Sequence, residues 1–163
     1  MASRERKRFT SCGCDNYTGV GRIVALDVGE RRIGVAVSDL TRTLARPHTA
    51  LQTTGLDGNA LQVSLDEIAR LAREDPIDAI VVGLPRHLDG SPNAMTPRVE
   101  RFAARLRDRA GVAVILQDER LTSIEAESLL ASRDKDWRAR KKRLDAAAAA
   151  IILQDYLDGQ TQP

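Results

Sequence analysis

The first third of the chain contains short apolar runs, each bounded by polar and glycine residues. Residues 22–27 and 33–38 are apolar or β-branched and are separated by a glycine-containing turn, which predicts a buried hairpin. A third extended segment, residues 43–51, contains Pro47. Because proline cannot donate a backbone hydrogen bond, we expect this segment to be an edge strand or an interrupted one.

Farther along the chain, apolar residues recur every three or four positions. This period predicts amphipathic helices over residues 57–74 and 95–110, the second ending at Gly111. Thr122 and Glu125 have the spacing of a capping box, which predicts a helix over residues 122–132. The remaining predicted elements are buried strands over residues 77–83 and 112–117 and a last helix over residues 144–157.

The order of these elements predicts an α/β fold. Adjacent strands at the start imply antiparallel pairing, whereas each later strand is reached through a helix and must be parallel to a neighbour. We therefore expect one domain, residues 22–158, with a mixed five-stranded sheet and helices on both faces. Residues 1–21 lack periodicity and are expected to form a flexible extension, and residues 159–163 a C-terminal tail.

Composition excludes several classes of protein. The 163 residues are 42% hydrophobic and 29% charged, which excludes a disordered or fibrous chain. No apolar run reaches the roughly 18 to 20 residues of a membrane span, and no apolar segment follows the basic N-terminal residues as in a secretory signal. A cytoplasmic protein without membrane contact is therefore expected. Cys12 and Cys14 lack the further ligands of a zinc site.

Positive charge is concentrated in residues 133–143, where the local net charge is +5 while that of the whole chain is +2. Such a run is commonly a solvated helix end, and the alternative is an arm that binds phosphate groups. Trp137 lies within it and either stacks on an unpaired base or anchors the helix by packing.

Acidic residues interrupt the apolar pattern where strands end. Asp27 closes the first predicted strand, Asp118 and Glu119 follow the last one, and Asp145 shares the apolar side of the last helix. Taken singly, each acid suits a turn or a helix cap. Several carboxylates brought together would repel unless a cation compensated them, and ligands that are all oxygen suit Mg²⁺ or Mn²⁺.

A carboxylate site with divalent ions can hydrolyse phosphodiester bonds, so a nuclease is the natural hypothesis. Gly29 and Gly34 leave room beside Asp27 for a phosphate backbone, and Arg31 and Arg32 supply positive charge there. Arg120 directly follows Glu119 and is a further candidate for contact with nucleic acid. Exposed arginines at a hairpin tip or helix cap are the alternative.

Four segments together resemble one known family. They are DVGERRIGVAVSD at 27–39, VVGLP at 81–85 with DG at 89–90, QDERLT at 117–122, and DAAAA at 145–149 with LQDY at 153–156. In this order they are similar to the YqgF/RuvX family. The resemblance covers residues 22–157.

The resemblance implies an RNase H-like fold and a nuclease that matures the 5′ end of pre-16S rRNA. It makes Asp27, Glu119 and Asp145 the catalytic metal ligands, with Asp118 assisting. Relatives in the RuvC branch carry their second acid at the end of the fourth strand, whereas here residues 83–85 contain none. The basic run leads into Asp145, so the residues expected beside the nucleic-acid backbone are Arg138, Arg140, Lys141, Lys142 and Arg143.

Three other functions remain open at this stage. A Holliday junction resolvase would act on four-way DNA, and its two symmetrical cuts would need a homodimer. A nucleotide-binding lobe is disfavoured because the chain is too short for a second lobe and Glu30 would repel phosphate. A non-catalytic RNA-binding factor in ribosome assembly would keep the fold and the basic run without hydrolysis.

Overall fold

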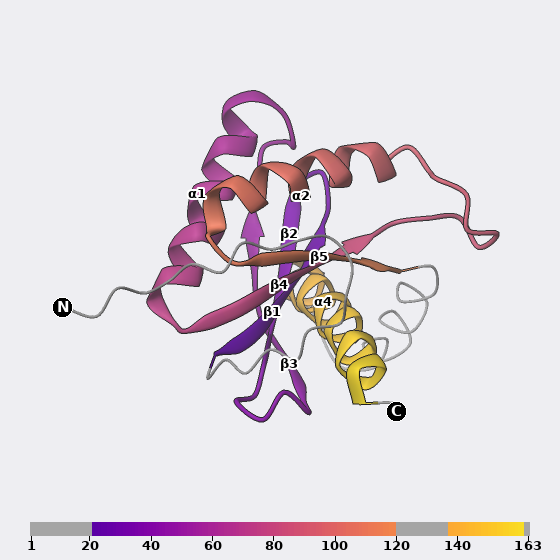
Figure 1. Cartoon of the computed structure of the whole chain (residues 1–163). Coiled ribbons are helices and arrows are strands. Elements are labelled where there is room, and N and C mark those ends of the chain that lie inside the picture. Colours follow the sequence, from indigo (N-terminus) through magenta and orange to yellow (C-terminus); the bar gives the residue numbers. More distant parts are fainter. Residues whose placement is uncertain (1–20, 120–136, 162–163) are drawn as a thin grey trace.

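Five strands form one mixed sheet in the order β3-β2-β1-β4-β5 (Figure 1). The structure, a computed structural model, describes residues 21–119 and 137–161. β2 (Arg32–Ser38) pairs antiparallel with both β1 (Arg22–Val28) and β3 (Ala45–Gln52). β4 (Ile77–Leu84) pairs parallel with both β1 and β5 (Ala113–Asp118). The predicted mixed five-stranded sheet is confirmed.

β3 lies at one edge of the sheet, as Pro47 predicts. Its pairing with β2 shifts register between Val35 and Ala36, which face Thr49 and Pro47 respectively. The irregularity therefore lies beside the residue that lacks a backbone donor.

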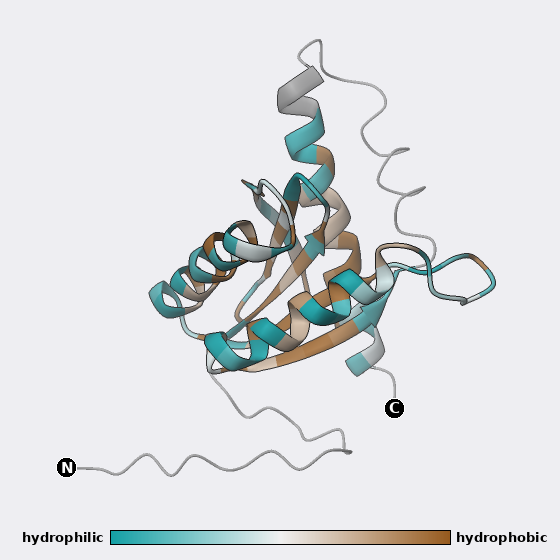
Figure 2. Cartoon of the chain, turned by 90° about the horizontal axis from the view of Figure 1, so that it is seen from above, coloured by the Kyte–Doolittle hydropathy of each residue, from teal (hydrophilic) through white to brown (hydrophobic). Residues whose placement is uncertain are grey.

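Helices cover both faces of the sheet, as expected. Figure 1 shows α1 (Gly58–Glu74) and α2 (Thr96–Ala110) on one side and α4 (Trp137–Thr161) on the other. In Figure 2 the strands lie in largely hydrophobic colours between helices that carry hydrophilic residues on their outer sides. No helix in the described ranges is long and apolar enough to span a membrane. The helix predicted over residues 122–132 lies outside the described residues, as do residues 1–20 of the predicted extension.

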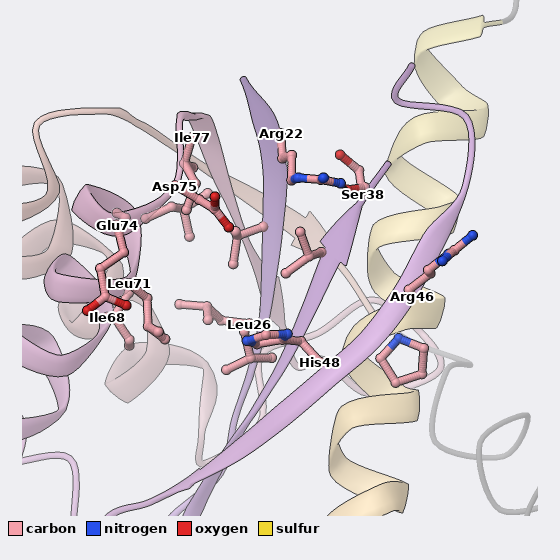
Figure 3. A pocket seen from close by; sticks show the side chains of 16 residues that line it. Arg22, Leu26, Ser38, Arg46, His48, Ile68, Leu71, Glu74, Asp75 and Ile77 are labelled. Atoms are coloured by element: carbon pink, nitrogen blue, oxygen red, sulfur yellow. Dashed lines mark hydrogen bonds between the residues drawn. The ribbon is translucent and has the colours of Figure 1, made fainter. Parts of the chain in front are cut away.

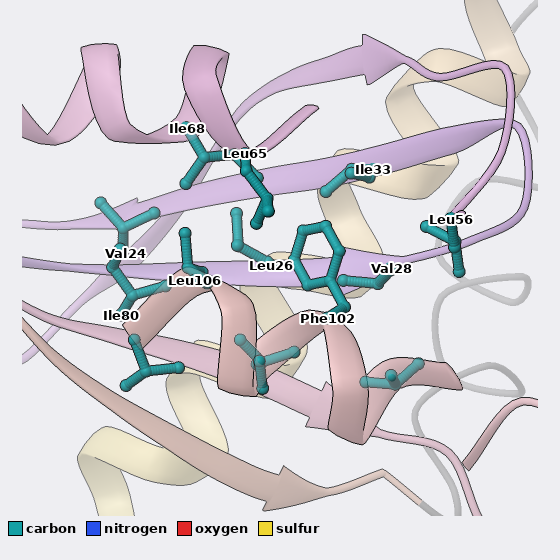
Figure 4. Packing of buried hydrophobic residues seen from close by; sticks show 14 of the residues in the cluster. Val24, Leu26, Val28, Ile33, Leu56, Leu65, Ile68, Ile80, Phe102 and Leu106 are labelled. Carbon is teal, nitrogen blue, oxygen red and sulfur yellow. The ribbon is translucent and has the colours of Figure 1, made fainter. Parts of the chain in front are cut away.

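The two faces hold separate apolar clusters. Large side chains fill the space between the sheet and α1 and α2, among them Leu26, Ile33, Leu65, Phe102 and Leu106, all fully buried (Figure 4). The cluster beneath α4 combines alanines, several of them on the strands, with large side chains of α4 such as Ile152, Tyr156 and Leu157. Its fully or almost fully buried members include Ala25, Ala36, Ala79, Ala149 and Leu153.

α4 is longer than the sequence pattern predicts. It begins seven residues before the predicted start and ends four residues after the predicted end. Arginine and lysine have high helix propensity, so the end of the basic run continues the helix although it carries no apolar period. Residues 159–161, expected as part of a tail, are its last residues.

Candidate active site

Polar residues gather on the face of the sheet that α4 covers, at the carboxyl ends of β1, β4 and β5. Asp27 in β1 shares this face with Ala25, because alternate residues of a strand point the same way. Asp27 pairs with Gly34 of β2, and Glu119 directly follows β5. The sequence placed these acids at strand ends, and the sheet order brings the strands together.

Gly83 in β4 gives room for the Glu119 side chain. A Cβ atom at Gly83 would lie 2.6 Å from Glu119 Oε2 and 2.6 Å from Ile152 Cδ1. The backbone N–H of Glu119 donates a hydrogen bond to the carbonyl oxygen of Leu84 over 3.2 Å. No acid ends β4, and the carboxylate of Glu119 instead lies over the β4 backbone.

Gly34 in β2 lets the backbone of α4 approach the sheet. A Cβ atom at Gly34 would collide with the carbonyl oxygen of Asp145. Since Gly34 pairs with Asp27, this contact brings the third acid to the first. The sequence suggested that Gly34 leaves room for a phosphate backbone, whereas the backbone of α4 occupies that room. A glycine inside a strand commonly marks such close approach.

Asp145 forms an ion pair with Arg32, the first residue of β2. Arg32 Nε lies 2.6 Å from Asp145 Oδ2, and the two side chains are 18% and 25% exposed. Among the described residues neither atom has a hydrogen-bond partner, so the contact between them is ionic. The sequence assigned Arg32 to nucleic acid and did not predict this pairing.

The electrostatics of the three acids show that they influence one another. Burial, followed by the charge of Asp145, raises the pKa of Asp27 to about 6. Burial, followed by the charges of Asp27 and Asp118, raises the pKa of Glu119 to about 8. Burial raises the pKa of Asp145, although the charges of Arg32 and Lys141 act in the opposite direction. A bound cation would relieve the cost of ionising these groups.

The donor atoms suit a divalent ion with oxygen ligands. Asp27 and Glu119 present carboxylates that are largely removed from water and repel each other when ionised. Within residues 21–119 and 137–161, however, no three acid, histidine or cysteine residues are grouped closely enough to hold a metal. Asp145 is directed to Arg32 instead, so the described arrangement offers two carboxylates and an ion pair beside them.

Basic residues line the approach along α4. Lys141, Lys142 and Arg143 are exposed on this helix, and Lys141 lies one turn before Asp145. Arg31 is exposed between β1 and β2, and its carbonyl oxygen accepts a hydrogen bond from the N–H of Thr53. The helix includes residues 137–140, so Arg138 and Arg140, both predicted to contact nucleic acid, belong to α4. Arg120, which carries the same prediction, lies outside the described residues.

Glu30, also between β1 and β2, has a structural partner that the sequence pattern did not predict. Its carboxylate pairs with Arg98 of α2, which also lies 3.4 Å from Asp57. These contacts tie the β1–β2 turn to the helix on the opposite face from α4.

A separate cavity lies at the other end of the sheet (Figure 3). Its volume is about 420 Å³, and its apolar lining includes Leu26, Ile68 and Ile80. Arg22 and Glu74 lie at its polar border, and none of the candidate acids lines it. The acids and this cavity therefore belong to different ends of the molecule.

Comparisons with known proteins agree on one family. The model of the RuvX family, described as "Holliday junction resolvase", matches residues 21–159. A protein of Roseiflexus sp. strain RS-1 is 41% identical over 140 residues, covering 86% of this chain and 96% of the relative. A protein of Nitrosospira multiformis is 43% identical over 138 residues, covering 85% and 88%. Both carry the name "Putative pre-16S rRNA nuclease".

The fold also matches a solved structure, that of T. thermophilus RuvC in complex with a Holliday junction substrate. The TM-score is 0.53 at 13% identity, with 85% of this chain and 94% of that chain covered. This likeness concerns the fold alone and confirms the expected RNase H-like architecture.

Proposed function

The chain belongs to the RuvX family, and from this premise we propose that it is a metal-dependent nuclease that hydrolyses phosphodiester bonds in the 5′ processing of pre-16S rRNA. The observation that carries the proposal is the placement of Asp27, Glu119 and Asp145 on one face of the sheet. Two glycines without side chains, Gly34 and Gly83, permit that placement. The expected setting is the cytoplasm, where rRNA precursors of bacteria are made.

The residues around the site have separable roles in this proposal. Asp27 and Glu119 would hold a divalent cation, Mg²⁺ or Mn²⁺, with Asp145 as a third ligand and Asp118 as an assisting acid. The cation would supply activation of water and stabilisation of the leaving oxygen. Glu119 has the higher pKa of the two buried acids, so without a cation it keeps its proton at neutral pH.

Contacts with the substrate backbone are proposed for the basic residues at the site. The exposed Lys141, Lys142 and Arg143 lie on the helix that carries Asp145, so a nucleic-acid strand along α4 would pass the acids. Arg31 and Arg32 extend the positive charge to the β1–β2 turn, and Arg120, Arg138 and Arg140 complete the proposed set. Such contacts are made to phosphate groups whatever the base sequence, and they make binding depend on the salt concentration.

The test is cleavage of a labelled 5′-extended 16S rRNA precursor by the full chain and by Asp27→Asn, in Mg²⁺, in Mn²⁺ and in chelator. Asp108→Asn is the matched control, because Asp108 is an exposed carboxylate on α2 outside the site. Metal-dependent cutting by the wild type and by the control, with loss in Asp27→Asn, is the expected result. Binding of the precursor without cutting by any protein would favour the non-catalytic assembly factor.

A second candidate is resolution of four-way DNA, which the family's description favours. The same three proteins are tested on a labelled four-way junction beside the rRNA precursor. Symmetrical cuts in the junction, with a homodimer in solution, would favour this activity. Cutting of the precursor alone would favour rRNA processing.

A further inference from the structure

We propose that Arg32 restrains Asp145 in the free protein, and that a phosphate group of the nucleic-acid substrate draws Arg32 away and frees Asp145 to complete the metal site. This inference rests on the proposed nuclease function and adds a link between substrate binding and metal binding. Arg32 is a positioning residue in it, because it acts through Asp145.

The ion pair forms where α4 comes closest to the sheet. Arg32 and Gly34 lie on the same face of β2, and α4 passes over Gly34 at Asp145. The side chain of Arg32 therefore meets Asp145 where the helix is closest to the sheet. With Nε and Oδ2 2.6 Å apart and both side chains mostly buried, this is a close ion pair that water screens little.

The intact ion pair opposes the binding of a cation at Asp145. A guanidinium beside Oδ2 of Asp145 repels a divalent ion that approaches the same carboxylate, because both are positive. Arg32 thus weakens metal binding as long as the pair is intact.

A substrate phosphate can release Asp145 by taking its place beside Arg32. A guanidinium binds phosphate oxygens through paired hydrogen bonds, so a phosphodiester group can replace the carboxylate as its partner. Arg32 is still 18% exposed, and the exposed Lys141, Lys142 and Arg143 lie on the helix at which it points. A strand held by these residues would bring its phosphates to Arg32.

The consequence is reciprocal coupling, since any ligand that raises the affinity for a second one is itself bound more tightly in its presence. Nucleic acid should raise the affinity for the metal, and the metal should raise the affinity for nucleic acid. The full set of ligands would then assemble only on a bound substrate.

The test measures Mn²⁺ binding by electron paramagnetic resonance, with and without a 2′-O-methyl RNA whose integrity is checked on a gel after each measurement. The proteins are the full chain, Arg32→Gln, Arg32→Lys and the control Arg42→Gln. Arg42 pairs with Asp78 at the other end of the sheet, and those side chains are 18% and 23% exposed, almost the values of the Arg32 pair. The control therefore removes an ion pair of similar exposure away from the acids, together with the hydrogen bonds from Arg42 to the Gly21 carbonyl oxygen.

Arg32→Gln should bind Mn²⁺ about tenfold more tightly than the wild type without RNA, within the range usual for coupled sites. RNA should raise the Mn²⁺ affinity of the wild type and of Arg42→Gln but not that of Arg32→Gln, and Arg32→Lys should lie between them. Adding Asp145→Asn should remove the difference between wild type and Arg32→Gln, which a general loss of structure would not do.

Equal or weaker Mn²⁺ binding by a folded Arg32→Gln, or no Mn²⁺ binding by any of the proteins, would overturn the proposal. If Arg32→Gln unfolds, Arg32→Lys decides the proposal: RNA should raise its Mn²⁺ affinity less than that of the wild type, and an equal rise would overturn the proposal. Coupling without cleavage of any substrate would refute the nuclease function and keep this inference. Cleavage without coupling would refute the inference alone.

Discussion

The two faces of the sheet differ in how closely backbone and charged groups approach the strands. On the side of α1 and α2, large residues such as Phe102 and Leu65 fill the space between helices and strands. Under α4, alanines and the glycines at 34 and 83 let a helix backbone and an acidic side chain lie directly on the strands. The first face stabilises the fold by apolar burial, and the second combines apolar burial with the close approach of charged groups.

This comparison predicts that large-to-small changes harm the first face most. Phe102→Ala removes a fully buried ring and should lower the free energy of unfolding by about 3 to 5 kcal/mol. Chemical denaturation measures the loss, and the activity of the fraction that remains folded should be unchanged because Phe102 lies on the other face from the acids. A loss below 1 kcal/mol would show that this face is not the main source of stability.

The acids on the α4 face should instead make the stability of the protein depend on pH. The pKa of Asp27 rises from the ordinary 3.8 to about 6 and that of Glu119 from 4.5 to about 8, so both groups favour the folded state when protonated. Their contribution is complete below pH 4 and is lost as pH rises through 6 and then 8. The free energy of unfolding should therefore fall between pH 4 and 8.

Asp27→Asn should reduce that fall by an amount on the order of 3 kcal/mol, which corresponds to a shift of about two pKa units. Urea denaturation of both proteins across this range checks the prediction, with Asp108→Asn as control. Added Mg²⁺ should restore stability to the wild type at pH 8 more than to Asp27→Asn. Parallel curves for wild type and variant would contradict the role given to Asp27.

Small-to-large changes should harm the α4 face, and unequally at its two glycines. Gly34→Ala meets the backbone of α4, which must move, and should cost about 1 to 3 kcal/mol. Gly83→Ala meets the ends of two flexible side chains, so it should cost less stability but displace Glu119. Thermal unfolding ranks the two variants, and Mn²⁺ affinity should drop in Gly83→Ala. A larger loss of stability in Gly83→Ala would reverse this assignment.

The smallest effect is expected on the outer surface of α1 and α2, away from both buried layers. Arg109 pairs with Asp66 across these helices, with side chains 40% and 65% exposed. Arg109→Ala should change the free energy of unfolding by less than about 1 kcal/mol, because water and salt screen such pairs. Denaturation at low and high salt should give nearly the same difference, and a larger value would show that the two helices depend on this contact.

Much of the fold could be predicted because its signals are local. The apolar runs marked the strands, Pro47 marked the edge strand, and Gly111 marked the end of α2. The start of α4 could not be placed, because its first turns lie in the basic run and carry no apolar period.

The sequence predicted which acids form the candidate site but did not predict the contacts that they make. Asp27 and Glu119 stand where apolar strands end, which a sequence displays directly. The pairing of Arg32 with Asp145 joins residues more than a hundred positions apart and depends on α4 meeting the sheet at Gly34. No local pattern encodes that contact, so the sequence supported only the general expectation that Arg32 binds phosphate.

The position of α4 in the order of elements matters during translation. All five strands precede α4 in the chain, and proteins begin to fold from the N-terminal side as they are synthesised. A nascent chain that has exposed its strands still lacks Asp145 and the helix that covers Asp27 and Glu119. The proposed hydrolytic centre therefore cannot assemble until α4 has been made and has docked.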